Sequence, residues 1–228
     1  LKKTIQSIEE QSDLNDVEYI VIDGDSKDAT LDVIKKSSVI DKYISEQDKG
    51  IYDAMNKGVS IALGEWFIFL NAGDAFNSRD VISDIKKEIQ SMPENVNLIY
   101  GDYISGGVFY RQNLNIDFLT SHMINHQNIF YKRTLFTEKR YSIKYRFCAD
   151  YKHLLDNFSS IEARKVNFII SEFDDTGISS QLNNKYKMWL ERLGAIWETD
   201  LPFITKCLLS RRGIIALPYQ FIRAAFLK

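Results

Sequence analysis

The chain has 228 residues, of which 45% are hydrophobic and 26% charged, and this composition suits one globular domain with a full core and a small appendage. A formal charge of -2 and an isoelectric point near 6.0 argue against a general nucleic-acid-binding protein, because such domains carry a clear basic excess. The two cysteines, Cys148 and Cys207, form no CxxC pair, so neither a zinc ribbon nor a disulfide framework is indicated and a reducing compartment is expected.

Amphipathic and β-branched segments alternate along the first hundred residues. The opening segment LKKTIQSIEEQ predicts a helix, because Leu1, Ile5 and Ile8 share one helical face. The patterns then predict, in order, a strand at 17–22, a helix at 28–36, a strand at 42–46, a helix at 48–64 that starts at Asp48 and stops at Gly64, a strand at 66–70, a helix at 79–91 and a strand at 97–103. This alternation predicts an α/β fold with a mainly parallel central sheet.

The second half is more mixed and ends in a basic, aromatic segment. A hairpin is expected at 106–111, a strand at 126–131 and a helix from Ala149, followed by helices from about 181. We expect one domain at 1–180 and a helical C-terminal extension at 181–228. No run of 18 apolar residues and no signal peptide is present, so neither a span nor an export signal is predicted. The basic extension is typical of a membrane-interface helix, or of helices that pack on the domain or on a second subunit.

Two of the predicted strands end in acids. Asp23 and Asp25 follow the first strand, and Asp74 follows the strand in WFIFLNAGDAF. Ligands bind beyond the carboxyl ends of strands in open α/β sheets, so these acids are placed to hold a nucleotide or a metal. The alternative is an ordinary turn, since Asn, Gly and Asp are common turn residues. Neither a P-loop nor a GxGxxG motif is present.

Several stretches, in order, carry a family resemblance. VIDGDSKDAT, EQDKGIYDAMNKGVSIALGEWFIFLNAGD, HQNIFYKRTLF, FCADYKHLL and FDDTGISS resemble the motifs of the family 2 glycosyltransferases with the GT-A fold, particularly bacterial members that build surface polysaccharides. The resemblance covers roughly residues 1–180. It implies a Rossmann-like sheet flanked by helices and inverting transfer of a sugar from a nucleotide-diphosphate sugar, with UDP favoured. The implied acceptor is a saccharide or a lipid-linked acceptor at the cytoplasmic face of the cell membrane.

The resemblance also implies roles for individual residues. Asp74 would ligate Mg²⁺ or Mn²⁺ as the last acid of a DxD-type motif, and Asp150 would be the catalytic base. The donor would be bound by Asp23, Asp25, Asp48, Lys49, Asn71 and Asp74, and the acceptor or diphosphate would meet His126 and Gln127. The chain departs from the family pattern at Asn71 and Gly73, where many relatives have Asp, and at Gly24, which replaces the second acid of an Asp pair.

The proposed base has a physical requirement of its own. A carboxylate beside the acceptor hydroxyl, opposite the leaving diphosphate, can remove the proton as the oxygen attacks the anomeric carbon. Aspartate is ionised at neutral pH and can take this part. Asp150 could instead cap a helix, and His126 and Gln127 could be structural. His122 and His126 are four residues apart but lack a HExxH motif, so zinc is not expected.

Two further expectations and two alternative functions remain open. The family's first strand precedes the position of Leu1, so this chain alone is expected to be poorly stable and inactive. A nucleotidyltransferase would also bind nucleotide and metal, but it usually carries a basic, Gly-rich loop near its start. A non-catalytic nucleotide-sugar-binding module would fit the thinned acidic motif. The sequence does not identify the sugar, the acceptor or the linkage.

Overall fold

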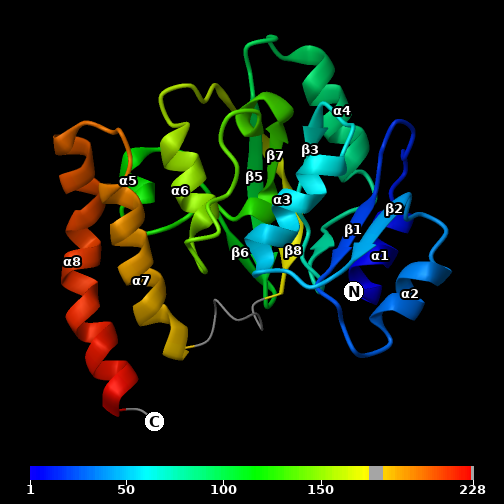
Figure 1. Ribbon diagram of the computed structural model, residues 1–228. Helices are drawn as coiled ribbons and strands as arrows, with labels where there is room; N and C mark the ends of the chain where they lie inside the picture. The colour runs from blue at the N-terminus through cyan, green and yellow to red at the C-terminus, as the bar shows by residue number, and fades with distance from the viewer. Residues whose placement is uncertain (175–181, 227–228) are drawn as a thin grey trace. The chain divides into compact units, whose positions relative to one another are not determined.

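The computed structural model describes residues 1–174 and 182–226, and Figure 1 labels its helices and strands. The chain forms two compact units. The first unit comprises Leu1–Arg111, Asn125–Arg140 and Ile161–Asp174. The second comprises Gln112–Ile124, Tyr141–Ser160 and the C-terminal segment. The boundary expected between 180 and 181 lies outside the described residues.

The first unit holds the strands and most of the shorter helices. Its elements are α1 (Lys2–Glu9), β1 (Ile20–Asp23), α2 (Thr30–Lys36), β2 (Lys42–Ser45), α3 (Ile51–Ile61), β3 (Trp66–Phe67), β4 (Ala75–Phe76), α4 (Val81–Ser91), β5 (Leu98–Ser105), β6 (Val108–Tyr110), the 3₁₀ turns η1 (His126–Asn128) and η2 (Arg133–Phe136), β7 (Ile129–Lys132) and β8 (Ala163–Phe173). The second unit contains α5 (Ile116–Leu119), α6 (Ala149–Asp156), α7 (Leu182–Trp197) and α8 (Phe203–Phe226).

The strands form two sheets, and their directions differ from the sequence prediction. β1 and β2 pair in parallel, and the larger sheet runs β3-β7-β5-β8-β4, with β6 paired to β5. Within the larger sheet only the β5–β8 ladder of the described strands is parallel. The α/β fold is therefore confirmed, but the mainly parallel sheet is wrong. One reason is local: β6 folds back on β5 through Gly106 and Gly107, whose positive φ angles of 54° and 76° make a tight turn.

The core of the first unit lies where α1 and α4 cover the larger sheet. Ile8 of α1 packs with Val81, Ile82 and Ile85 of α4 and with Ile99 of β5. Burial of each such side chain contributes roughly 1.5–3 kcal/mol. The same face of α1 also buries Thr4, which is 1% exposed. A polar side chain is thus carried inward on an otherwise apolar helix face.

The predicted start and stop of the third helix are wrong by two or three residues. α3 begins after Gly50, whose φ is 121°, and ends before Ala62. Asp48 does not cap the helix, since its Oδ1 accepts the N–H of Gly50 at 2.8 Å in the preceding turn. The carboxylate of Asp48 therefore stabilises the turn that precedes the helix.

α7 and α8 pack side by side in the second unit (Figure 1). Side chains of α7 contact α8 at Gly213, where a Cβ would lie 3.0 Å from the side chain of Leu193. Arg192 of α7 is buried, with its guanidinium 4.6 Å from the ring centre of Tyr151 in α6. It also donates to the carbonyl oxygens of Leu119 and His122. In the part of the chain that the structure describes, no helix combines the length and apolarity needed to cross a bilayer.

Candidate active site

Asp23 ends β1 as a buried carboxylate. Its Oδ2 accepts the hydroxyl of Ser45 at 2.7 Å and the backbone N–H of Ser26 at 3.2 Å. Burial by itself raises the pKa of Asp23, but these hydrogen bonds outweigh it and hold the pKa below its ordinary value. Asp23 is therefore ionised at neutral pH. Asp25, by contrast, is exposed and pairs with Lys27 at 2.6 Å.

Asp48 lies against the backbone that follows Asp23. A Cβ added at Gly24 would be 2.5 Å from Oδ2 of Asp48. The glycine that departs from the family's acid pair therefore makes room for the carboxylate of Asp48. The neighbouring Lys49 has an exposed side chain, and its N–H donates to Asp53 at 3.0 Å. The structure thus brings Asp23 and Asp48 together.

Asp74 is almost fully buried, with 1% of its surface exposed. Its Oδ2 accepts the N–H of Asn71 at 3.1 Å and Nε2 of Gln127 at 3.0 Å. Its Oδ1 accepts the N–H of Asp174 at 2.9 Å. Burial raises the pKa of Asp74, although these three donors act against the increase. The carboxylate links the turn after β3 to the end of β8.

The turn η1 joins three parts of the first unit through three consecutive side chains. His126 places Nε2 3.2 Å from the amide nitrogen of Asn71, and Gln127 donates to Asp74. Asn128 accepts both the N–H and the hydroxyl of Ser171 in β8, at 3.1 and 2.9 Å. Oε1 of Gln127 is buried and has no hydrogen-bond partner among the residues that the structure describes. Asn71, Asp74, His126 and Gln127 therefore form one cluster, as the predicted donor-binding and diphosphate residues would.

Asp150 belongs to the second unit, in the first turn of α6. It is 9% exposed, and its Oδ1 accepts the N–H of Tyr151 at 2.8 Å. The N-cap of α6 is Cys148, so Asp150 does not occupy the cap position. The start of the helix is instead held by Glu191 of α7, which accepts the N–H groups of Arg146 and Phe147 at 3.0 and 2.8 Å. α7 therefore holds the segment that leads into the N-terminal end of α6, the helix that carries Asp150.

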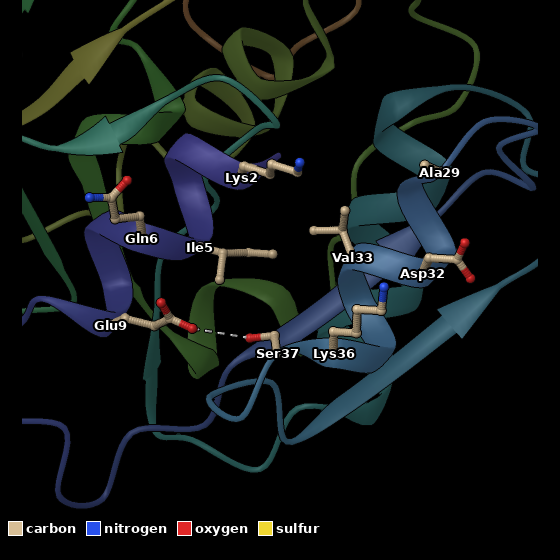
Figure 2. Close-up of a pocket in the computed structure, with 9 residues that line it drawn as sticks. All are labelled: Lys2, Ile5, Gln6, Glu9, Ala29, Asp32, Val33, Lys36 and Ser37. Carbon is tan, nitrogen blue, oxygen red and sulfur yellow. Dashed lines mark hydrogen bonds between the residues drawn. The ribbon is translucent and has the colours of Figure 1, made fainter.

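A separate groove of about 450 Å³ lies between α1 and α2 (Figure 2). Its walls carry both signs of charge, with Lys2 and Lys36 beside Glu9 and Asp32, over Ile5 and Val33. Glu9 accepts a hydrogen bond from Ser37 across the groove at 3.5 Å. None of the predicted site residues lines it, so we do not assign the active site to this groove.

The comparison with protein families decides the identity of the chain. Residues 1–156 match the model of Glycosyl transferase family 2. The PGL/p-HBAD biosynthesis glycosyltransferase of Mycobacterium bovis (strain BCG / Pasteur 1173P2) is 33% identical over 187 residues, covering 78% of this chain and 72% of the relative. The chain belongs to glycosyl transferase family 2.

Solved structures show the same fold at low sequence identity. A mannosyltransferase from Pyrobaculum calidifontis, solved with GDP-Man and Mn²⁺, aligns with a TM-score of 0.72 at 15% identity over 98% of this chain and 68% of the other. S. aureus TarS 1-349 in complex with UDP-GlcNAc aligns with a TM-score of 0.71 at 14% identity over 99% of this chain and 69% of the other. The GT-A fold expected from the sequence is confirmed.

Two residues of this glycosyltransferase that sequence reasoning missed complete the Asp74 cluster. Thr4 accepts the N–H of Gly73 at 3.0 Å and donates to the carbonyl of Asn71 at 3.3 Å. Asp174 places its carboxylate over Gly73, where a Cβ would be 2.4 Å from Oδ2. Thr4 could have been found as a polar residue on the apolar face of the first helix. Asp174 lies directly after β8, but this strand was not predicted.

The residue expected to hold a metal is engaged in hydrogen bonds within the first unit of this glycosyltransferase. Both oxygens of Asp74 already accept N–H groups, and the side chain is buried. Among residues 1–174 and 182–226, no group of three or more His, Cys, Asp or Glu side chains is arranged to hold a metal ion. Asp74 therefore acts in this structure as a structural acceptor, and its assignment as a Mg²⁺ or Mn²⁺ ligand stays a prediction.

Proposed function

We propose that this chain is an inverting glycosyltransferase that moves a sugar from a UDP-sugar to a saccharide or lipid-linked acceptor. Family membership supports glycosyl transfer. Structural neighbours solved with UDP-GlcNAc and GDP-Man support a nucleotide sugar as donor. The proposed setting is cell-surface polysaccharide biosynthesis at the cytoplasmic face of the membrane, where lipid-linked acceptors are extended.

The donor-binding part of the proposal depends on Asp23. This acid lies at the carboxyl end of β1, where open α/β sheets bind ligands. Its lowered pKa keeps it ionised, so it can accept hydrogen bonds from the N–H of a base or from a ribose hydroxyl. Asp48, which lies beside it, provides a second acceptor. The cluster around Asn71 and His126 is proposed to meet the diphosphate and sugar.

Asp150 is proposed as the general base. Its carboxylate takes the proton of the acceptor hydroxyl while that oxygen forms a bond to the anomeric carbon. The bond from the anomeric carbon to the diphosphate oxygen breaks at the same time, and the nucleoside diphosphate leaves with the electron pair. Attack from the side opposite the leaving group inverts the anomeric configuration.

We propose no catalytic step through a metal. The structural neighbour with Mn²⁺ and GDP-Man favours a divalent cation in the donor complex. The occupied oxygens of Asp74 weigh against this acid as its protein ligand. Calorimetric titration of UDP in the presence of Mn²⁺ and then of EDTA measures whether a cation assists donor binding.

The test of the proposed function compares two aspartates on one helix. Asp150→Asn is expected to abolish UDP release from UDP-sugars, assayed with a bacterial lipid extract as acceptor, while UDP binding by calorimetry is retained. Asp156→Asn is the matched control, because Asp156 lies at the other end of α6 and pairs with Lys152. Unchanged UDP release by Asp150→Asn would overturn the base assignment.

The same assay separates the alternative functions. A nucleotidyltransferase would release pyrophosphate from a nucleoside triphosphate and a sugar phosphate. A non-catalytic binding module would bind UDP-sugars and release no UDP. The anomeric configuration of the product, measured by NMR, tests inversion.

A further inference from the structure

One face of α8 is apolar and exposed. Phe203, Ile204 and Ile214 have 70%, 74% and 62% of their surface exposed, and Leu208 has 41%. Trp197, at the end of α7, is 46% exposed and lies edge to face with Phe203, with ring centres 5.9 Å apart. We call these five residues the apolar strip. Exposed large apolar side chains that lie on one side of a helix indicate an interaction site, and here they share that side with the exposed Arg211.

The opposite face of α8 already has its partner. Leu209 and Ser210 are 0% and 1% exposed, and Gly213 packs closely against Leu193 of α7. Ile204 and Leu208 are four residues apart and so share the outward face of the helix. The apolar strip is therefore additional to the residues that hold α8 in the fold.

The charge of the same segment indicates which kind of partner would cover the apolar strip. Residues 201–228 contain five basic side chains and no acidic one: Lys206, Arg211, Arg212, Arg223 and Lys228. Since the whole chain has a formal charge of -2, the residues before 201 together carry -7. The segment that presents the apolar strip is thus net positive in a chain whose remainder is net negative. Two copies of this segment would repel each other, whereas an anionic lipid surface attracts both its charge and its apolar side chains.

Two of these cations, Arg211 and Arg212, lie where they can meet lipid headgroups. Arg212 is exposed, and Arg211 pairs at 3.1 Å with a highly exposed acid, Asp117. Exposed pairs of this kind contribute about 0–1 kcal/mol, so an anionic headgroup can compete with Asp117. Trp197 and Phe203 add the aromatic side chains that are enriched at membrane interfaces.

We propose that α8 lies in the headgroup region of an anionic bilayer, with the apolar strip inserted and Arg211 and Arg212 on phosphate groups. The lipid surface would be a partner of the proposed transferase. Only the purpose of this contact, access to a lipid-linked acceptor, rests on the proposed function. Binding of the helix to lipid is independent of the transfer reaction.

Flotation of the whole chain with lipid vesicles tests the proposal. The chain is expected to float with phosphatidylcholine vesicles that contain phosphatidylglycerol, and to stay at the bottom with phosphatidylcholine alone. High salt is expected to weaken the binding, because it screens the charge attraction. Absence of flotation with the anionic vesicles would overturn the proposal.

Two variants with matched controls locate the binding face. Ile204→Asp is expected to weaken vesicle binding by more than about tenfold, because it removes an inserted apolar side chain. Arg212→Glu is expected to weaken it by about tenfold or more, because it removes one favourable charge and adds an unfavourable one. Leu63→Asp and Lys35→Glu are the controls, since both residues are exposed in the first unit, and both variants should float like the unaltered chain.

Two parallel measurements make the outcomes distinct. Calorimetric UDP binding by the same samples shows that the variants are folded, and flotation without UDP binding would contradict the proposed function but not the lipid contact. Gel filtration over a range of concentrations detects a dimer. A dimer that Ile204→Asp dissociates, in a chain that does not float, would assign the apolar strip to a second copy and overturn the lipid proposal.

Discussion

The carboxylate of Asp74 connects three segments of the first unit. It accepts three N–H groups that come from the β3 turn, from η1 and from the end of β8. In an Asp74→Asn variant, the side-chain NH₂ group would replace one of these oxygens and would face an N–H donor. A buried donor without a partner costs roughly 1–3 kcal/mol.

The first prediction follows from this arrangement. Asp74→Asn is expected to lower the free energy of unfolding by about 1–3 kcal/mol, measured by urea denaturation at neutral pH. Asp32→Asn, at an exposed position of α2, is the control and should change stability by less than about 0.5 kcal/mol. An Asp74→Asn variant of unaltered stability would show that the three hydrogen bonds do not hold the turn.

The second prediction concerns the pH dependence that Asp23 confers. Its folded pKa lies below the ordinary value of 3.8, so its ionised form stabilises the folded state. This contribution is complete above the unfolded pKa and is lost as the pH falls through the folded pKa. The stability difference between the unaltered chain and Asp23→Asn should therefore be constant above about pH 5 and shrink at lower pH.

Asp74 is expected to behave in the opposite way, and this provides the internal comparison. Because its folded pKa is raised above 3.8, protonation of Asp74 favours the folded state, and this contribution is lost as the pH rises through the folded pKa. Denaturant midpoints measured for Asp23→Asn and Asp74→Asn across the acidic range should diverge from the unaltered chain with opposite pH slopes. Parallel slopes would contradict both pKa directions.

The sequence predicted the positions of the acids better than their partners. Asp23 and Asp74 were expected at strand ends because each follows an apolar run. The structure places Asp23 at the end of β1, whereas Asp74 lies in a turn directly before β4. The hydrogen bond between Asp74 and Asp174 joins residues 100 positions apart. No local pattern in the sequence specifies such a pair, so the structural use of Asp74 was not foreseen.

At the scale of elements, two glycines are used for opposite reasons. Gly73 has a φ of 109°, and a Cβ there would lie 2.4 Å from the carboxylate of Asp174. Gly58 lies inside α3, where a Cβ would make an ordinary contact of 3.6 Å with Ile22. A turn requires the first glycine, whereas a helix only tolerates the second.

The third prediction compares alanine at these two positions. Gly73→Ala is expected to lower the free energy of unfolding by about 1–3 kcal/mol, because alanine is strained at this φ. Gly58→Ala is expected to raise it by about 0.5–1 kcal/mol, because alanine loses less conformational freedom in a helix. Urea denaturation of both variants checks the signs, and a stabilising Gly73→Ala would contradict the described turn.

Helices were easier to predict than strand pairing. α1, α3 and α4 follow the 3.6-residue spacing of their apolar residues, and the predicted ranges differ from the observed ones by a few residues at each end. β8 was missed because ARKVNFIISEF lacks a regular alternation of buried and exposed positions. Strand direction depends on long-range pairing, such as the parallel β5–β8 ladder, which local patterns do not encode.

At the scale of the whole molecule, donor binding should appear as added stability. The fourth prediction is that UDP raises the apparent melting temperature, because a ligand at about 100 times its Kd stabilises the native state by roughly 2.7 kcal/mol. Asp23→Asn should reduce the shift and Asp32→Asn should not. A shift that is equal in all three proteins would place UDP away from Asp23.

The hydrogen bonds of Glu191 connect α7 to the segment just before α6. The acid belongs to α7, which packs along α8, and α6 carries Asp150. A bilayer that holds α8 would therefore set the height of Asp150 above the lipid through the helix contacts of the second unit. The protein would then determine how far from the membrane surface an acceptor hydroxyl must lie in order to reach Asp150.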